Sequence, residues 1–156
     1  EVKAKVARVI DGKTRKRTET YIVPDCEFFV AAEHVVMGSL SDEHEAGLVE
    51  GFEIQSMRIS PIKEVCDQWL EDYTTSGYPA FLATLKDIWL ADDGTEKSLK
   101  YKVLLWAENH SQALHRVQGL ARQGYDMQIE GIKQVDYEYL VGTSETNNIE
   151  EEAGNE

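Results

Sequence analysis

The sequence has little of what marks several specialised classes of protein. It contains only two cysteines in 156 residues, Cys26 and Cys66, so it is not a disulfide scaffold. Their spacing matches no metal motif, and the sequence leaves open whether the two thiols form a bridge. No apolar run approaches the ~20 residues that a membrane-spanning helix needs, and no signal peptide is visible. We therefore expect a reduced, cytoplasmic setting.

Basic residues are also scarce. The chain has 16 Lys and Arg against 29 Asp and Glu, which gives a net charge of −13. Domains that coat duplex DNA through bulk charge are usually basic, so this balance argues against that class. Residues 142–156 carry only negative charges and few apolar residues, which predicts a flexible acidic tail. We interpret this tail as a solubilising extension first and as a recruiter of partners second.

Catalytic and metal-binding patterns are missing as well. There is no nucleophile elbow and no glycine-rich phosphate loop. His110 and His115 are five residues apart, whereas zinc pairs on a helix are three or four apart. Asp92 and Asp93 fall in a predicted turn, where Asp is expected for turn geometry alone. We expect no catalytic residue, no metal and no cofactor.

What the sequence does contain is an internal repeat. Asp11-Gly12 and Asp93-Gly94 are 82 positions apart, and each lies between runs of β-forming residues, which predicts two hairpins. Further aligned segments are 21–23 with 103–105 at the same offset, and 54–65 with 129–140 at an offset of 75. The change of offset falls in a longer loop of the first copy, at residues 41–50.

Each copy is predicted to form two strands, a helix and a third strand. The predicted strands cover residues 2–10, 18–23 and 52–59, then 81–91, 99–106 and 127–135, with an extension through Tyr137, Tyr139 and Val141. Residues 28–40 carry apolar side chains at helical spacing. The second helix runs through Ala113 and Val117, with Ser111 or Asn109 as its cap and Gly124 at its end.

These elements predict an α+β fold made of two tandem β-β-α-β repeats packed into one domain. The domain covers residues 1–141 and is followed by the tail. It divides into repeat one (2–66), a packed helical connector (67–79) and repeat two (80–141). The strands form either one continuous sheet or two sheets, with the helices on one face. A homodimer that pairs an exposed strand edge with its copy fits this architecture.

The repeat also carries a family resemblance. The sequence ARVIDGKTRKRTETYIVPDCEFFVAAEHVV, then GFEIQSMRISPIKEV, LATLKDIWLADDGTEKSLKYKVLLWAENHSQALHRV and IEGIKQVDYEYLV, resembles a domain of unknown function found in gut anaerobic bacteria and their phages. In that family a Tyr-Leu-Val strand end precedes an Ala-rich helix, and here residues 21–23 and 28–33 occupy those places. The chain departs from the family at Cys26 and in the loop 41–50. The resemblance implies a phage or mobile-element setting and no known activity.

Two basic clusters are the most informative surface signal. Lys13, Arg15, Lys16 and Arg17 crowd the first hairpin, and Lys97, Lys100 and Lys102 occupy the matching place in the second copy. If these two clusters formed one stripe beside the aromatic residues Trp89, Tyr101 and Trp106, the surface would suit single-stranded nucleic acid. The alternative interpretation is that the cations only protect edge strands and that the aromatic residues belong to the core.

We therefore expect a non-enzymatic binding protein of a phage or mobile element, associated with single-stranded nucleic acid. One alternative is a protein-binding anti-host factor that acts through its acidic surface. The other is a small-molecule-binding protein that uses a cleft between the repeats, which converging polar groups in a pocket would favour.

Overall fold

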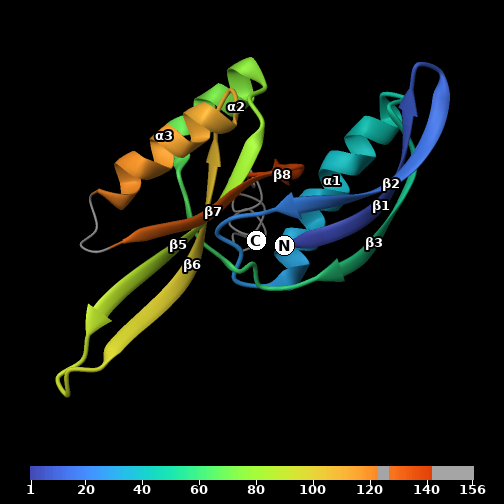
Figure 1. Ribbon diagram of the computed structural model, residues 1–156. Helices are drawn as coiled ribbons and strands as arrows, with labels where there is room; N and C mark the ends of the chain where they lie inside the picture. The colour runs from blue at the N-terminus through green and yellow to red at the C-terminus, as the bar shows by residue number, and fades with distance from the viewer. Residues whose placement is uncertain (123–126, 142–156) are drawn as a thin grey trace, which may run out of the picture. The chain divides into compact units, whose positions relative to one another are not determined.

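A computed structural model describes residues 1–122 and 127–141. These residues form an α+β structure with three α-helices and two mixed four-stranded sheets (Figure 1). The described residues divide into unit 1, made of residues 1–59 and 137–141, and unit 2, which lies within residues 60–136. The tail predicted at 142–156 and the helix end predicted at Gly124 lie outside the described residues. No helix in the described part of the chain is long and apolar enough to cross a membrane.

Unit 1 is a four-stranded sheet covered by one helix. Its elements are β1 (Val2–Ile10), β2 (Lys13–Ile22), α1 (Phe29–Glu45), β3 (Val49–Met57) and β8 (Tyr137–Tyr139). The strand order is β3-β1-β2-β8, and only the pairing of β8 with β2 is parallel. Alternating residues of β1 point into the core, where Val2 and Val6 pack with Val36 and Leu40 of α1.

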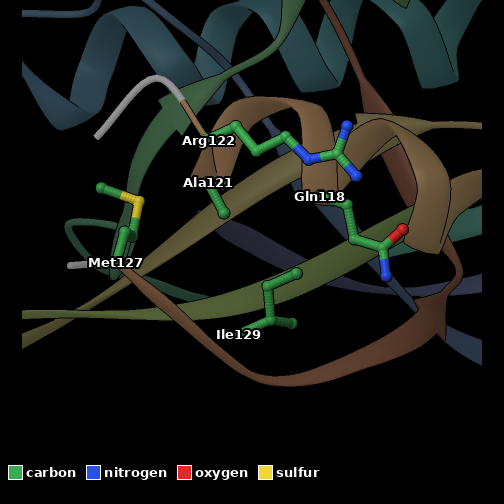
Figure 2. A pocket seen from close by; sticks show the side chains of 5 residues that line it. All are labelled: Gln118, Ala121, Arg122, Met127 and Ile129. Carbon is green, nitrogen blue, oxygen red and sulfur yellow. The ribbon is translucent and has the colours of Figure 1, made fainter. Parts of the chain in front are cut away.

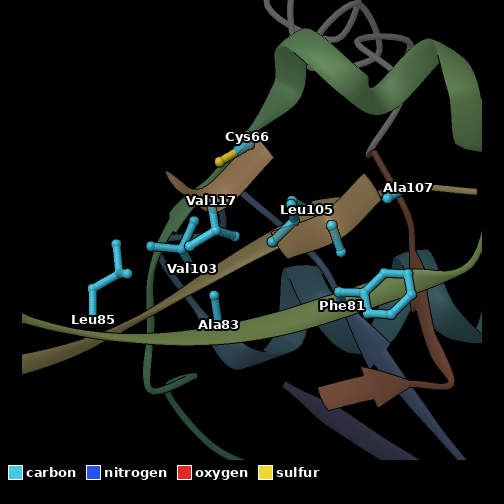
Figure 3. Packing of buried hydrophobic residues seen from close by; sticks show 9 residues of the cluster. Cys66, Phe81, Ala83, Leu85, Val103, Leu105, Ala107 and Val117 are labelled. Atoms are coloured by element: carbon cyan, nitrogen blue, oxygen red, sulfur yellow. The ribbon is translucent and has the colours of Figure 1, made fainter. Parts of the chain in front are cut away.

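Unit 2 has the same strand order with its own helix. Its elements are β4 (Ile62–Val65), a 3₁₀ turn η1 (Asp67–Trp69), α2 (Leu70–Ser76), β5 (Ala80–Leu90), β6 (Glu96–Trp106), α3 (His110–Ala121) and β7 (Gln128–Val135). The order is β4-β6-β5-β7. Read from its other end, β7-β5-β6-β4 corresponds strand by strand to β3-β1-β2-β8 of unit 1, and the pairing of β4 with β6 is parallel, like that of β8 with β2. Its core packs Phe81, Leu85 and Leu105 of the sheet against Val117 of α3 (Figure 3).

One edge strand of each sheet follows the other unit in the sequence. β4 follows β3 of unit 1 along the chain yet belongs to unit 2, and β8 follows β7 of unit 2 yet belongs to unit 1. Equivalent main-chain bonds continue these two additions, since the Cys66 N–H donates to Leu104 and the Leu140 N–H donates to Ile22. The fourth strand of each sheet therefore comes directly after the third strand of the other sheet in the sequence.

Most predicted elements are present. The strand at 2–10 and the two Asp-Gly turns are confirmed, with Asp11, Gly12 and Gly94 all at positive φ. Asn109 rather than Ser111 caps α3, because its side chain accepts a hydrogen bond from the Gln112 N–H at 2.9 Å. The predicted helical connector contains η1 and α2.

Two predictions about elements were wrong, and one strand was not predicted. The first half of the loop predicted at 41–50 is helix, because nothing in residues 41–45 breaks α1 before Gly47 turns the chain at φ +77°, and its last two residues already belong to β3. The second strand starts at Lys13 rather than residue 18, so the basic residues belong to β2 itself. The four-residue strand β4 was not predicted, because its pairing with β6 is parallel and distant in sequence.

The pairing of β8 gives a test of this topology. Replacing Leu140 with Pro removes the N–H that bonds to the Ile22 carbonyl at 3.0 Å. We expect the free energy of unfolding of unit 1 to fall by about 1–2 kcal/mol, the worth of one backbone hydrogen bond plus some packing. Native-state hydrogen exchange of the β1 and β2 amides measures this change.

Val141→Pro is the matched control for this substitution, because Val141 is exposed and follows the last paired residue. It should leave the exchange of unit 1 unchanged. Equal effects of both substitutions would contradict the assignment of β8 to this sheet.

Candidate nucleic-acid interface

The candidate site is the outer edge of β2. β8 pairs only with Thr20, Tyr21 and Ile22 at the end of that strand. No strand within residues 1–122 and 127–141 covers the remainder of this edge, from Lys13 to Glu19. All residues from Lys13 to Thr18 are exposed. The sequence therefore places four cations on an open strand edge.

The register of β2 with β1 assigns these cations to the two faces of the sheet. Residues directly opposite each other share a face, so Arg17, opposite the buried Val6, lies on the helix-covered face. Arg15 and Lys13 follow at intervals of two and share that face. Lys16 lies on the opposite face. The cations therefore flank the open edge from both sides of the sheet.

An ion network lies behind this edge, on the same face as Arg15 and Arg17. The Arg8 Nε donates to both carboxylate oxygens of Glu19, at 2.6 and 2.8 Å, and the guanidinium also pairs with Glu43 of α1. The hydrogen bond to Glu43, followed by that to Glu19, raises the pKa of Arg8 above its ordinary value, so Arg8 stays charged. Arg17 lies 3.7 Å from Glu19. Arg8 and Arg17 therefore both engage the one carboxylate of this edge.

Sequence reasoning missed this network, although a signal was present. Arg8 continues the inward alternation of Val2, Ala4 and Val6, which places a charged residue on the helix-covered face. A cation on such a face needs an anionic partner. The buried Glu19, which is 6% exposed, is that partner.

The lysines of unit 2 occupy a different setting. Lys97 lies opposite Trp89, whereas Lys100 and Lys102 lie on the other face of the sheet. The ammonium of Lys100 lies 2.8 Å from the Glu130 carboxylate. Glu96 is also on β6, so the exposed part of this strand has mixed charge, whereas residues 13–18 of β2 carry only basic charges. The expectation that both clusters form one stripe stays a prediction.

The aromatic residues do not form a stacking platform. Trp106 is fully buried and stacks on Tyr73 at 5.5 Å between ring centroids. Tyr101 bonds through its hydroxyl to the Met127 sulfur, and Lys63 covers its ring. Trp89 alone of the three predicted aromatics is exposed, at 43%. The interpretation of Trp106 and Tyr101 as packing residues is therefore the better one.

Other candidate groups have structural roles. The Asp93 side chain accepts a hydrogen bond from the Thr95 N–H at 3.0 Å, and its bonds to Thr95 lower the pKa of the carboxyl. His44 Nδ1 contacts the Val49 carbonyl at 2.8 Å at the end of α1. Within residues 1–122 and 127–141, no group of three or more His, Cys, Asp or Glu is placed to hold a metal ion.

One shallow depression lies in unit 2 between α3 and β7. It has a volume of about 360 Å³ and is lined by Gln118, Ala121, Arg122, Met127 and Ile129 (Figure 2). It is open to solvent, and Arg122 is the charged residue among the described residues that line it. Converging polar groups are the mark of a small-molecule site, and the lining residues that the structure describes offer two polar side chains, Gln118 and Arg122.

Comparison of the chain with protein-family models, curated proteins and solved structures finds no match. The resemblance to the domain of gut bacteria and their phages therefore stays an expectation.

The Arg8 network gives a prediction about stability. Arg8→Ala removes the closer, hydrogen-bonded guanidinium partner of the buried Glu19 carboxylate and leaves only Arg17 at 3.7 Å, so we expect the free energy of unfolding to fall by about 2–3 kcal/mol. Glu43→Gln should cost about 1 kcal/mol or less, because Glu43 is more exposed and Arg8 keeps Glu19. Urea unfolding of both variants measures the two values. A larger loss for Glu43→Gln would contradict this ranking.

The two cysteines give a prediction about reactivity. Both are free thiols; Cys66 is buried, whereas Cys26 is half-buried in the loop before α1. Burial, and after it the nearby Glu64, raises the pKa of Cys66 to about 12. The reactive thiolate of Cys66 is therefore scarce at pH 8. We expect iodoacetamide to modify only Cys26 in the native protein and both thiols in urea, as read by mass spectrometry. Rapid native labelling of Cys66 would contradict this environment.

Proposed function

We propose that this chain is a non-enzymatic, cytoplasmic binding protein of a phage or mobile element, and that it holds single-stranded nucleic acid along the outer edge of β2. The observation that carries the proposal is the density of charge on that edge. Four of the five residues from Lys13 to Arg17 are cationic, and all are exposed on a strand edge that β8 leaves open.

The shape of this edge suits an extended polyanion. A strand advances about 3.3 Å per residue, so Lys13, Arg15 and Arg17 present charges about 6.6 Å apart in a straight row. Lys16 adds a charge on the other face. Because Glu19 is engaged by Arg8, no free carboxylate interrupts the row. An anionic chain laid along β2 would meet cations from Lys13 to Arg17.

Edge protection alone explains this pattern less well. One charged residue is often enough to keep an exposed strand from pairing with another sheet. Four adjacent cations also repel one another, which is a cost that a bound anion would remove. In a chain with a net charge of −13, their concentration on one strand favours a binding role.

The proposed setting rests on the family resemblance, and the architecture supports its repeat. We infer that the two units derive from tandem copies, because their sheets share one strand order. The register shift between Lys3 and Ala4 in β1 also matches the shift between Thr84 and Leu85 in β5. Directly after this shift, Ala4 of β1 pairs with Ile54 of β3, and Leu85 of β5 pairs with Ile129 of β7. Ile54 and Ile129 are aligned residues of the two sequence repeats.

The proposal predicts binding that weakens steeply with salt. Each phosphate contact on a single strand contributes a slope of about −0.7 to log K against log salt, so four contacts give about −3. Arg15→Ala/Arg17→Ala should weaken binding at low salt and make the slope shallower by about 1.4. Fluorescence anisotropy of labelled oligothymidine with the full chain measures both quantities.

Lys3→Ala/Lys5→Ala is the matched control, because it removes two exposed cations from β1. Both edges of β1 are paired, with β2 on one side and β3 on the other. It should leave the slope nearly unchanged. No binding at low salt, or equal losses in both double variants, would overturn the proposal. The first of these outcomes would make the acidic surface and a protein partner the leading alternative.

A further inference from the structure

The hairpin of β5 and β6 extends beyond the rest of its sheet. β7 pairs with β5 only from Ala80 to Lys86, and the pairing of β4 with β6 starts at Lys102. Residues 87–101 therefore form a two-stranded ribbon whose edges no strand of the described residues covers. Figure 1 shows this hairpin projecting past β7.

This ribbon exposes large apolar side chains. Trp89, Leu90 and Leu99 are 43%, 72% and 51% exposed. Trp89 and Leu99 lie on one face of the ribbon, and Leu90 lies on the other. A two-stranded ribbon is only marginally stable in water, and exposed apolar patches mark interaction surfaces. A further strand paired with the ribbon would cover both its main chain and part of this apolar surface.

The main chain of β6 shows which residues would pair. The Leu104 carbonyl faces the β4 edge, because it accepts the Cys66 N–H at 2.9 Å. Alternate residues point the same way, so Lys100, Ser98 and Glu96 present their N–H and C=O groups at the open edge. These residues lie before the first β4 pair at Lys102, so that pair leaves them accessible.

We propose that this edge pairs with the same edge of a second copy of the chain, in antiparallel register about a twofold axis at Ser98. In this register Ser98 lies opposite its own copy, and Glu96 lies opposite Lys100 of the other copy. The pairing is self-complementary, because both Glu–Lys pairs recur by symmetry. Lys100 contacts Glu130 in its own chain, and its ammonium retains donors for a second carboxylate.

The apolar residues fit the same register. Leu99 lies opposite Lys97 of the other copy, and Lys97 lies opposite Trp89 within its own ribbon. Leu99 therefore packs against the aliphatic part of a lysine side chain, with a tryptophan beyond it. The added strand turns two marginal ribbons into one four-stranded ribbon.

The open edge of β2 also presents the main chain of alternate residues, but its side chains are cationic rather than of mixed charge. The Ile22 carbonyl faces β8, so Thr18, Lys16 and Thr14 present their main chain outward. Lys13, Arg15, Lys16 and Arg17 on that strand would repel a second copy. The two edges therefore select different partners, and this inference does not depend on the nucleic-acid proposal.

Sedimentation velocity of the full chain over a range of concentrations tests the proposal. We expect a monomer–dimer equilibrium. Glu96→Lys and Lys100→Glu should each raise the dissociation constant by about tenfold or more, because each replaces two attractive pairs with two repulsive ones. An equimolar mixture of these two variants should restore dimers, since the heterodimer contains only opposite-charge pairs.

Glu27→Lys is the control, because it makes the same change of charge at an exposed loop residue. It should dimerise like the original chain. A monomer at all concentrations would overturn the proposal, and so would a dimer that Glu96→Lys does not weaken or a mixture that stays monomeric. Rescue by mixing also excludes misfolding as the cause of any loss.

Discussion

A β-strand that pairs on one side only presents unpaired N–H and C=O groups on the other, and this constraint underlies the whole account. In each unit the fourth strand is short: β8 covers Thr20 to Ile22 of β2, and β4 covers Lys102 to Leu104 of β6. Long segments of both strands are left open. Each open edge must be protected or paired, so the side chains along it decide what it meets.

The same short strands tie the two units together along the chain. β4 is reached from β3 of unit 1 and completes the sheet of unit 2, while β8 is reached from β7 and completes the sheet of unit 1. Each sheet reaches four strands only with such a segment, β4 in unit 2 and β8 in unit 1. This arrangement explains why the boundary of unit 2, at residues 60–136, does not coincide with the ends of the predicted repeats.

Local patterns predicted the elements well, and the failures came from tertiary pairing. Alternation gave the strand at 2–10, and positive-φ chemistry gave the turns at Asp11-Gly12 and Gly94. The strand β4 has only four residues and depends on a parallel partner about 40 positions away, so no local signal marks it. The same holds for the candidate site residues, whose identity was predicted from the sequence while their placement on the sheet was not. Composition singled out the cations, but only the register with β1 assigns Arg15 and Lys16 to opposite faces.

The central claim is that the β2 edge is open, and amide hydrogen exchange measured by NMR on the full chain tests it most directly. We expect protection of the amides to alternate along the strand. The amides of Thr14, Lys16 and Thr18, which point outward, should exchange rapidly. Those of Arg15 and Arg17, which pair with β1, should be protected. Slow exchange at Lys16 and Thr18 without any ligand would show that the edge is already covered and would contradict the account.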